Sequence, residues 1–331
     1  MPMLARRNFI ASGGAAIAAP AFIGRAQAQA YPSRFVRLVC PFPPGGAVDA
    51  AARIIANRLS EMWGHQMVIE NRPGAGGNIA ALAVLNSEPD GYTIYICSIG
   101  HAINQFIYPS IGYNPVTDFA PVTLMCVYPN IMAVPNSSPD RSVPDFIARA
   151  KADPGKVTYA SSGVGTSLHL SGELFKRLAG VDLTHIPYRG AGPALNDLIP
   201  GRVDAIFANF PSTLPLVQQG TVRGLAVTTA KRQPEVPNLP AIGEFVPGYD
   251  VSSWFALFVA AKTPPEIIAK LNADAVAALN YPPVKERYAQ LGATVVGSTP
   301  DELAAHLKAE MERWAPIIKA AGIKAAGIKA D

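Results

Sequence analysis

The sequence predicts an α/β protein of two lobes, each with a mostly parallel β-sheet flanked by helices. Short apolar runs alternate with helical stretches along the chain, which is typical of parallel sheets covered on both faces. The stretch after the first apolar run is an example, because Val48, Ala51, Ile55 and Leu59 recur at helical spacing. The chain has 331 residues, more than a single hydrophobic core usually organises, so we expect two lobes.

The individual elements follow from this alternation. Strands are predicted at residues 35–40, 67–70, 93–97, 157–160, 183–187 and 203–207. Helices are predicted at residues 48–62, from 79 onward, and at 143–152, 168–179 and 192–199. The C-terminal part reads as helical, with capping boxes beginning at Thr263 and Thr299, and with Gly292 ending a helix that starts near Pro283.

Two further apolar stretches are predicted to cross between the lobes. They are residues 122–134, interrupted by Pro129, and residues 251–261. We therefore expect a first lobe made of residues 31–128 and 251–331 and a second lobe made of residues 129–250.

Residues 1–30 are predicted to be an export signal. Arg6 and Arg7 precede a weakly apolar, alanine-rich stretch, and Ala-x-Ala patterns end at Ala28 and Ala30. Paired arginines are also typical of a twin-arginine signal. A membrane anchor is the alternative, but the stretch is short and broken by glycines and a proline, and no later stretch has the roughly 20 apolar residues of a span. We expect a soluble periplasmic protein after cleavage near residue 28 or 30.

The charge argues against nucleic acid as a partner. The formal net charge of +4 falls to +1 without residues 1–30, which carry three arginines and no acidic residue. No run of lysines and arginines is interleaved with aromatic residues, so the footprint of a nucleic-acid-binding surface is missing.

We expect no cofactor and no metal. The five histidines show no metal-ligand spacing, and the G-x-G patterns at 74–76 and 163–165 lack the third glycine of a dinucleotide-binding loop. Cys40, Cys97 and Cys126 each lie in an apolar run and are expected to be buried thiols, with a Cys40–Cys97 disulfide as the alternative.

Two glycine-rich loops carry the functional prediction. Pro41–Asp49 follows the first predicted strand, and Ser161–Ser167 follows the strand at 157–160. Where such a loop opens a helix, unpaired backbone N–H groups and the positive end of the helix dipole attract an anion. Neither loop contains a cationic side chain. Two such loops in different lobes predict a cleft that closes on one negatively charged ligand.

Other loops at the carboxyl ends of predicted strands extend this site, because ligands of open α/β sheets bind there. We predict the following ligand-binding residues: Phe42, Pro43, Gly45, Gly46, Ala47, Asp49, Ser98, His101, Ser161, Gly163, Gly165, Thr166, Ser167, Asn209 and Phe210. Asp49 would repel an acid, so it either caps the helix, orders a water or accepts a hydrogen bond from a ligand amine or amide. The glycines of Asn71–Asn78 either contact the ligand or only turn the backbone.

Catalysis is the alternative to binding. Ser167 and His169 are close in sequence, as in a hydrolase, but side chains at i and i+2 on a helix point apart. The chain has no G-x-S-x-G elbow and no H-E-x-x-H motif. We therefore predict that the protein is not an enzyme.

Several motifs occur in a fixed order over the whole mature chain. They are Phe42–Gly46 with Asp49, Asn71–Asn78, Pro89–Thr93, Tyr159 with Ser161–Gly163, His185–Gly190, Gly201–Asp204 and Trp254. By these motifs the chain resembles the Bug family, which comprises the solute-binding receptors of tripartite tricarboxylate transporters. One departure is Ser98–Asn104, which is one residue shorter than the family's usual serine–glycine–threonine–histidine form.

The resemblance implies a type II periplasmic-binding-protein fold with a cleft between its lobes. A ligand carboxylate would be held by the loops Pro43–Asp49 and Ser161–Ser167. The ligand would be a small organic acid: a monocarboxylate, a dicarboxylate, an amino acid or an aromatic acid. The partners would be the membrane subunits of the transporter, and the receptor would be a monomer. An extracytoplasmic sensor that uses the same cleft is the alternative, and a periplasmic hydrolase is a further one.

Overall fold

The computed structural model describes residues 31–324, and the predicted export signal with its cleavage site lies outside these residues. Residues from Pro32 onward form one unit of the chain. Within the described residues, no helix combines the length and the apolar character needed to cross a membrane.

The first sheet is built around three parallel strands. β1 (Val36–Cys40) lies between β2 (Met67–Asn71) and β3 (Thr93–Cys97) and is parallel to both. β9 (Ser252–Ala260) and the long β4 (Phe119–Pro135) continue the sheet in the antiparallel direction. The short strand β10 pairs with β4 at Thr294–Val295.

The second sheet has the same plan. β5 (Thr158–Ser161) is parallel to β6 (Thr184–Pro187) and to β7 (Ala205–Asn209). β7 and β8 (Val222–Val227) both pair with the end of β4 in the antiparallel direction. We call the parts of the chain around these two sheets the first and the second lobe.

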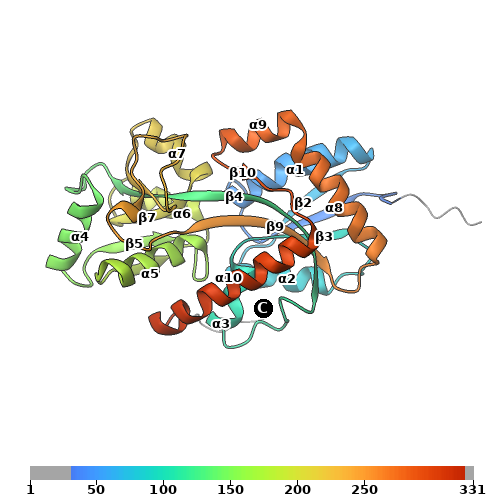
Figure 1. The fold of residues 1–331 in the computed structure, drawn as a ribbon, viewed down its shortest axis with the longest axis horizontal. Helices are drawn as coiled ribbons and strands as arrows, with labels where there is room; N and C mark the ends of the chain where they lie inside the picture. Colours follow the sequence, from blue (N-terminus) through green and yellow to red (C-terminus); the bar gives the residue numbers. More distant parts are fainter. Residues whose placement is uncertain (1–30, 325–331) are drawn as a thin grey trace, which may run out of the picture. The chain divides into compact units, whose positions relative to one another are not determined.

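The strand β4 belongs to both sheets. Its residues up to Pro129 pair with β9, and its residues from Asn130 onward pair with β7 and β8. Figure 1 shows β4 and β9 side by side where they pass between the lobes. The prediction that Pro129 interrupts this stretch is wrong. A proline lacks the N–H that a ladder needs, and here it lies where the strand changes partners.

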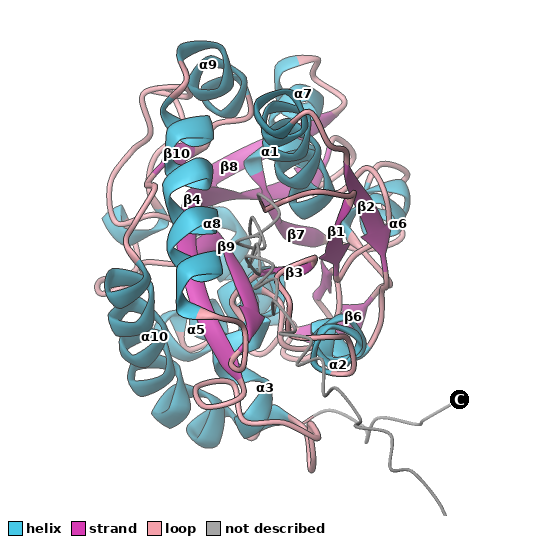
Figure 2. Ribbon diagram, turned by 90° about the vertical axis from the view of Figure 1, so that its right-hand side faces the viewer, coloured by secondary structure: helices cyan, strands magenta, loops and turns pink. Residues whose placement is uncertain are grey.

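The helices cover both sheets (Figures 1 and 2). They are α1 (Ala47–Trp63), α2 (Asn78–Leu85), α3 (Gly100–Ile107), α4 (Val143–Ala152), α5 (Ser167–Ala179), α6 (Ala191–Leu198), α7 (Phe210–Gln218), α8 (Pro265–Asn280), α9 (Pro282–Gln290) and α10 (Pro300–Ala321). The helices α3 and α7 were not predicted from the sequence. Both are short, at eight and nine residues, neither has a side-chain N-cap, and α7 contains two prolines, so each offers few of the signals that mark a helix in a sequence.

The two predicted capping boxes have different outcomes. At Thr299 the box is confirmed, because its hydroxyl accepts from the N–H of Glu302 and the Glu302 carboxylate accepts from the N–H of Thr299. At Thr263 it is wrong. The helix α8 begins one residue later, at Pro265, so Glu266 is the second helical residue and not the third.

The three cysteines are free and buried, so the alternative of a Cys40–Cys97 disulfide is wrong. The strand register explains this, because Val39 lies opposite Tyr95 and Cys40 is therefore level with Ile96. Neighbouring residues of a strand point to opposite faces, which directs the Cys97 side chain away from Cys40. Burial raises the pKa of the Cys40 thiol to about 12.

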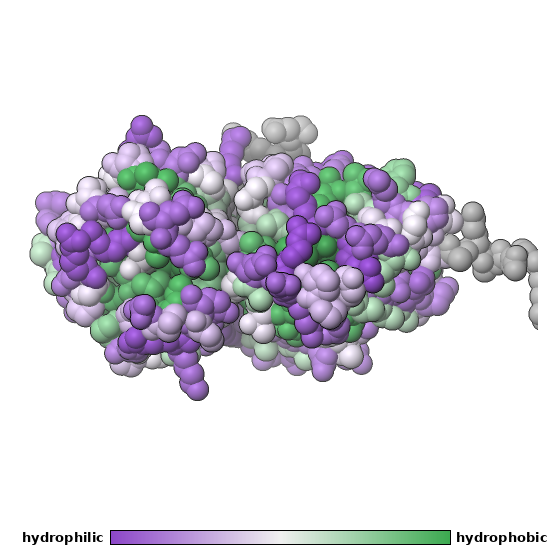
Figure 3. Space-filling model, turned by 90° about the horizontal axis from the view of Figure 1, so that it is seen from above, coloured by the Kyte–Doolittle hydropathy of each residue, from purple (hydrophilic) through white to green (hydrophobic). Residues whose placement is uncertain are grey.

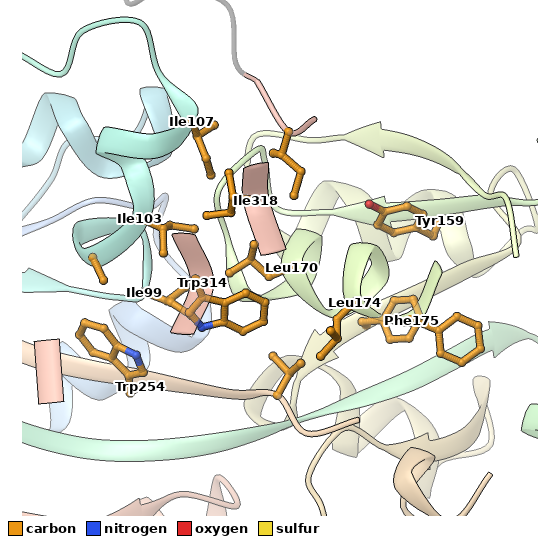
Figure 4. Packing of buried hydrophobic residues seen from close by; sticks show 14 of the residues in the cluster. Ile99, Ile103, Ile107, Tyr159, Leu170, Leu174, Phe175, Trp254, Trp314 and Ile318 are labelled. Carbon is orange, nitrogen blue, oxygen red and sulfur yellow. The ribbon is translucent and has the colours of Figure 1, made fainter. Parts of the chain in front are cut away.

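The helix α10 packs against both lobes. In Figure 4, Trp314 and Ile318 lie between Ile103 of α3 and Leu170 of α5, and all four belong to one buried cluster. The indole N–H groups of Trp254 and Trp314 both donate to the buried Glu310 carboxylate, at 2.9 and 3.3 Å. Burying side chains of this size contributes about 1.5–3 kcal/mol each. The same apolar cluster therefore ties α10 to both lobes.

Exposed apolar side chains are scattered. On the face drawn in Figure 3, hydrophilic residues cover much of the surface, and the hydrophobic areas are small and separate. The large exposed apolar residues come from different parts of the chain, for example Phe35, Val116, Phe245 and Tyr281. Single exposed apolar residues are ordinary on soluble proteins.

Candidate functional site

A cavity of about 340 Å³ is lined by the starts of three helices. The first lobe contributes the loop and first turn of α1, Phe42–Val48. The second lobe contributes Thr166–Leu168 at the start of α5 and Gly190–Pro193 at the start of α6. A Cβ atom placed on Gly190 would lie 3.6 Å from the Pro43 ring, so the two lobes face each other across this cavity.

Nine of the predicted site residues line this cavity. They are Phe42, Pro43, Gly45, Gly46, Ala47, Ser98, Thr166, Ser167 and Asn209. They lie at or just after the carboxyl ends of four strands, β1, β3, β5 and β7. Ligands of parallel sheets bind at this edge.

Asp49 lies behind the first loop and is 2% exposed. One carboxylate oxygen accepts from the Gly45 N–H at 2.9 Å and the other from the Asn71 amide at 3.0 Å. The Arg53 guanidinium donates to both oxygens, at 2.8 and 3.1 Å. Burial alone raises the pKa of Asp49, but these hydrogen bonds outweigh it and hold the pKa below its ordinary value. Of the three roles considered for Asp49, the contacts fit capping, because its carboxylate reaches back to an N–H that precedes the helix.

The second loop also has residues that do not line the cavity. Ser161 is fully buried, with its hydroxyl 2.6 Å from Nε2 of His185. Gly163 and Gly165 direct their N–H groups to the Ser161 hydroxyl and to Nδ1 of His169, at 3.1 and 3.3 Å. These three residues were predicted to contact the ligand, whereas their polar groups point to the protein beneath the loop.

His101 and Phe210 serve packing. His101 is enclosed by the rings of Tyr95, Tyr113, Phe119 and Phe258, and its Nε2 lies 3.2 Å from the Pro115 carbonyl oxygen. Burial lowers the pKa of this imidazole to about 4.

Phe210 is buried against Gly292, where a Cβ atom would collide with its ring. A residue that directly follows a strand end can thus turn into the core instead of the cleft, which the sequence pattern does not distinguish.

The segment Asn71–Asn78 does not line the cavity. Gly76 and Gly77 have φ angles of +64° and +102°, so glycine is required for the turn. Asn71 donates to the Phe42 carbonyl at 2.9 Å and so helps to shape the first loop. Of the two alternatives for these glycines, backbone turning matches the structure.

Several residues that line the cavity were not predicted from the sequence. They are Pro44, Val48, Ser162, Leu168, Gly190, Ala191, Gly192, Pro193, Ser253 and Phe255. The start of α6 carried a usable signal, since Gly190-Ala191-Gly192 follows a strand and opens a helix as in the other two loops. Ser253 and Phe255 lie within β9, and nothing in the sequence marks which face of that strand borders a cleft.

None of the side chains that line the cavity is charged. Its polar groups are hydroxyls and one amide, and Ser167 and Ser253 are linked by a hydroxyl–hydroxyl contact of 3.0 Å. Any positive potential therefore comes from the helix starts, whose first N–H groups have no partner within the helix. Within residues 31–324, no group of three or more His, Cys, Asp or Glu side chains is arranged to hold a metal ion.

Comparison with known proteins agrees with this geometry. Residues 51–323 match the model of the tripartite tricarboxylate transporter family receptor. The chain belongs to this family. The receptors of this family are periplasmic solute-binding proteins. Protein BugT of Bordetella pertussis is 36% identical over 319 residues, which cover 96% of each chain.

Solved structures show the same fold. Rpa4515 of R. palustris, solved with adipate, has a TM-score of 0.86 and 44% identity, with 89% of this chain and 99% of that one covered. MatC (Rpa3494) from Rhodopseudomonas palustris, solved with bound malate, has a TM-score of 0.83 and 33% identity, with 87% and 100% covered. The predicted α/β fold of periplasmic binding proteins, with its cleft between two lobes, is confirmed.

Proposed function

We propose that this protein captures a small organic acid in the cleft and delivers it to the membrane subunits of a tripartite transporter. The observation that carries the proposal is the convergence of three helix starts on a cavity without charged side chains. The family and the acids bound by the two Rhodopseudomonas proteins support it. Capture for transport takes place in the periplasm, so export through the N-terminal 30 residues is part of this proposal. The division into two lobes at residues 128/129 and 250/251 is also part of it, because the cleft lies between them.

The energetics of the cleft suit a carboxylate. A helix start stabilises an anion by up to about 2 kcal/mol in a partly buried site. Each charge-assisted hydrogen bond adds about 1.5–3 kcal/mol. Micromolar affinity requires only about 8 kcal/mol. The α1 and α5 starts, with the hydroxyls of Ser98 and Ser167, therefore supply enough stabilisation without a lysine or an arginine.

The remaining walls suit an acid with an apolar body. Phe42, Leu168, Pro193 and Phe255 line the same cavity. Burial stabilises a chain of methylene groups by about 0.8 kcal/mol per CH₂, whereas desolvating a ligand hydroxyl that has no hydrogen-bond partner costs free energy. We therefore propose that the ligand is a carboxylic acid with a methylene or aromatic body.

The protein acts as a binder and not as a catalyst in this proposal. The Ser161–His185 pair has the atoms of a nucleophile and a base, but Ser161 is fully buried and neither residue lines the cavity. A bound acid in the cleft would not reach this serine hydroxyl.

Isothermal titration calorimetry tests the proposed function. We expect micromolar or tighter binding of adipate and at least tenfold weaker binding of malate, which carries a hydroxyl on a shorter body. Adipamide is the matched control, because it keeps the chain of adipate and removes both charges, and we expect no measurable binding. Binding of adipamide as tight as that of adipate would contradict carboxylate recognition. Stronger binding of malate would contradict the preference for an apolar body.

A further inference from the structure

Two stacked histidines lie directly beneath the second glycine-rich loop. His169 belongs to the first turns of α5, and His185 lies on β6. Their ring centroids are 4.1 Å apart and the ring planes differ by 22°. His169 is 4% exposed and does not line the cavity, so neither the binding proposal nor the packing of the core accounts for its polar atoms.

Each imidazole makes a hydrogen bond to the loop. Nδ1 of His169 accepts from the Gly165 N–H at 3.3 Å, and Nε2 of His185 lies 2.6 Å from the Ser161 hydroxyl oxygen. That oxygen in turn accepts from the Gly163 N–H at 3.1 Å. The N–H groups of Gly163 and Gly165 are thus held by the two rings, directly at Gly165 and through one hydroxyl at Gly163.

The loop end that faces the cavity depends on this arrangement. Thr166 donates its hydroxyl hydrogen to the Gly163 carbonyl at 2.7 Å and accepts from the His169 N–H, which makes it the N-cap of α5. Ser162, Thr166 and Ser167 then border the cavity. A shift of Gly163 or Gly165 would move these residues relative to a bound carboxylate.

We propose that His169 and His185 are positioning residues that hold the loop Ser161–Ser167 in its ligand-binding conformation through uncharged imidazoles. The inference rests on the proposed function, because it assigns the loop to ligand binding. His169 must keep Nδ1 unprotonated to accept from Gly165, so its ring hydrogen is on Nε2, 4.0 Å from the Glu173 carboxylate. A charged imidazole would place a donor against the Gly165 N–H.

The surroundings keep both rings neutral. From α5, Glu173 and Lys176 face His169, and Glu173 is itself bound by Lys176 at 3.1 Å and by the Tyr159 hydroxyl of β5 at 2.6 Å. From β6, the ring of His185 stacks on His169, and β7 carries no titratable side chain. From α10, Trp314 and Ile318 pack against α5. Burial, followed by the charge of Lys176, lowers the pKa of His169 to about 4. Burial, with His169 as the next cause, lowers the pKa of His185 to about 3.

The first test compares His169→Leu with His169→Asn. Leucine removes the acceptor at similar size, whereas the asparagine side-chain oxygen can accept from Gly165. We expect His169→Leu to raise amide hydrogen exchange at Gly163 and Gly165 and to weaken adipate binding roughly tenfold, about the effect of one lost hydrogen bond. His169→Asn should restore both to within about threefold of the wild type. His65→Leu, at a partly exposed position outside the cavity, is the control for the substitution type.

The second test uses pH, because His169→Asn cannot titrate at this position. As the pH falls from 7 to 4, wild-type affinity for adipate should decrease relative to that of His169→Asn, because protonation of Nδ1 destroys the acceptor. The protonation of adipate itself affects both proteins equally and cancels in the ratio.

The outcomes separate the two proposals. Wild-type exchange rates in His169→Leu, or a constant affinity ratio between pH 7 and pH 4, would overturn the positioning role. If the wild type binds no acid, the proposed function fails, whereas the exchange experiment still decides whether the histidines hold the loop.

Discussion

The two glycine-rich loops meet the same requirement in different ways. Each must present backbone groups to the cleft while its remaining N–H groups are bonded elsewhere. In the first loop the buried Asp49 carboxylate binds the Gly45 N–H, and Arg53 neutralises it. In the second loop the neutral rings of His169 and His185 perform this role.

The difference shows how a charge can be used beside an anion site. Asp49 would repel a carboxylate, but both of its oxygens are occupied and Arg53, which is half exposed, lies beside it. A neutral ring carries no such penalty and needs no counter-ion. We infer that the first loop depends on an ion pair and the second on the protonation state of a ring.

The largest expected effect comes from replacing one glycine of each loop with valine, which should affect affinity and stability differently in the two loops. Gly46 has φ −82° and its Cβ would meet only the Pro43 carbonyl oxygen, at 3.8 Å, so Gly46→Val should keep the fold and fill the cavity. We expect adipate affinity to fall by about 100-fold or more with an unchanged melting temperature. Gly163 has φ +123°, a conformation that valine rarely adopts, so Gly163→Val should lower both affinity and stability, by about 1–3 kcal/mol. Calorimetry and thermal unfolding measure both, and wild-type binding by Gly46→Val would remove the first loop from the site.

An intermediate effect is expected from Asp49→Asn. Asparagine loses the ion pair with Arg53. Its NH₂ group also replaces one acceptor oxygen and faces groups that themselves donate, so we expect a loss of about 1–3 kcal/mol in the free energy of unfolding. The relative affinity for amino and non-amino acids should not change, because both carboxylate oxygens bind protein groups. Urea unfolding and calorimetry with glutamate and adipate provide the measurements. A changed preference would assign Asp49 a role in recognition.

The smallest effect is expected from Thr166→Val. This change removes the N-cap hydroxyl of α5, which should cost about 1 kcal/mol of stability, whereas Thr166→Ser should have little effect. The first loop offers the contrast, since its N-cap Gly46 has no side-chain cap and Gly46→Ala removes none. Equal urea midpoints for Thr166→Val and the wild type would show that the second loop is held by the histidines alone.

Much of the fold could be predicted from the sequence because its signals are local. The helix at 143–152 and the strand at 93–97 have the predicted bounds, since the pattern of apolar residues marks them within a few residues. The helices α3 and α7 were missed because both are short and lack a side-chain N-cap, and because α7 contains two prolines.

The site could be predicted in part for the same reason. Nine of the predicted residues line the cavity. Seven come from the two glycine-rich loops, and Ser98 and Asn209 were predicted because they follow other strands, and both signals can be recognised along the chain. Ser253 and Phe255 could not be found, because a strand pairs with distant segments and its faces are assigned only when the sheet forms.

The amino-acid sequence alone determined that helices begin after strands at glycine-rich turns, and hence that unpaired N–H groups are present for an acid. Only the tertiary structure decided which groups face the cleft and which face the protein. Asp49, Ser161 and Gly165 lie in these turns, yet they bond to Arg53, His185 and His169, of which His185 lies on another strand. The physical reason is that a hydrogen-bond donor takes the nearest acceptor in space, and neighbours in space are set by packing and strand register.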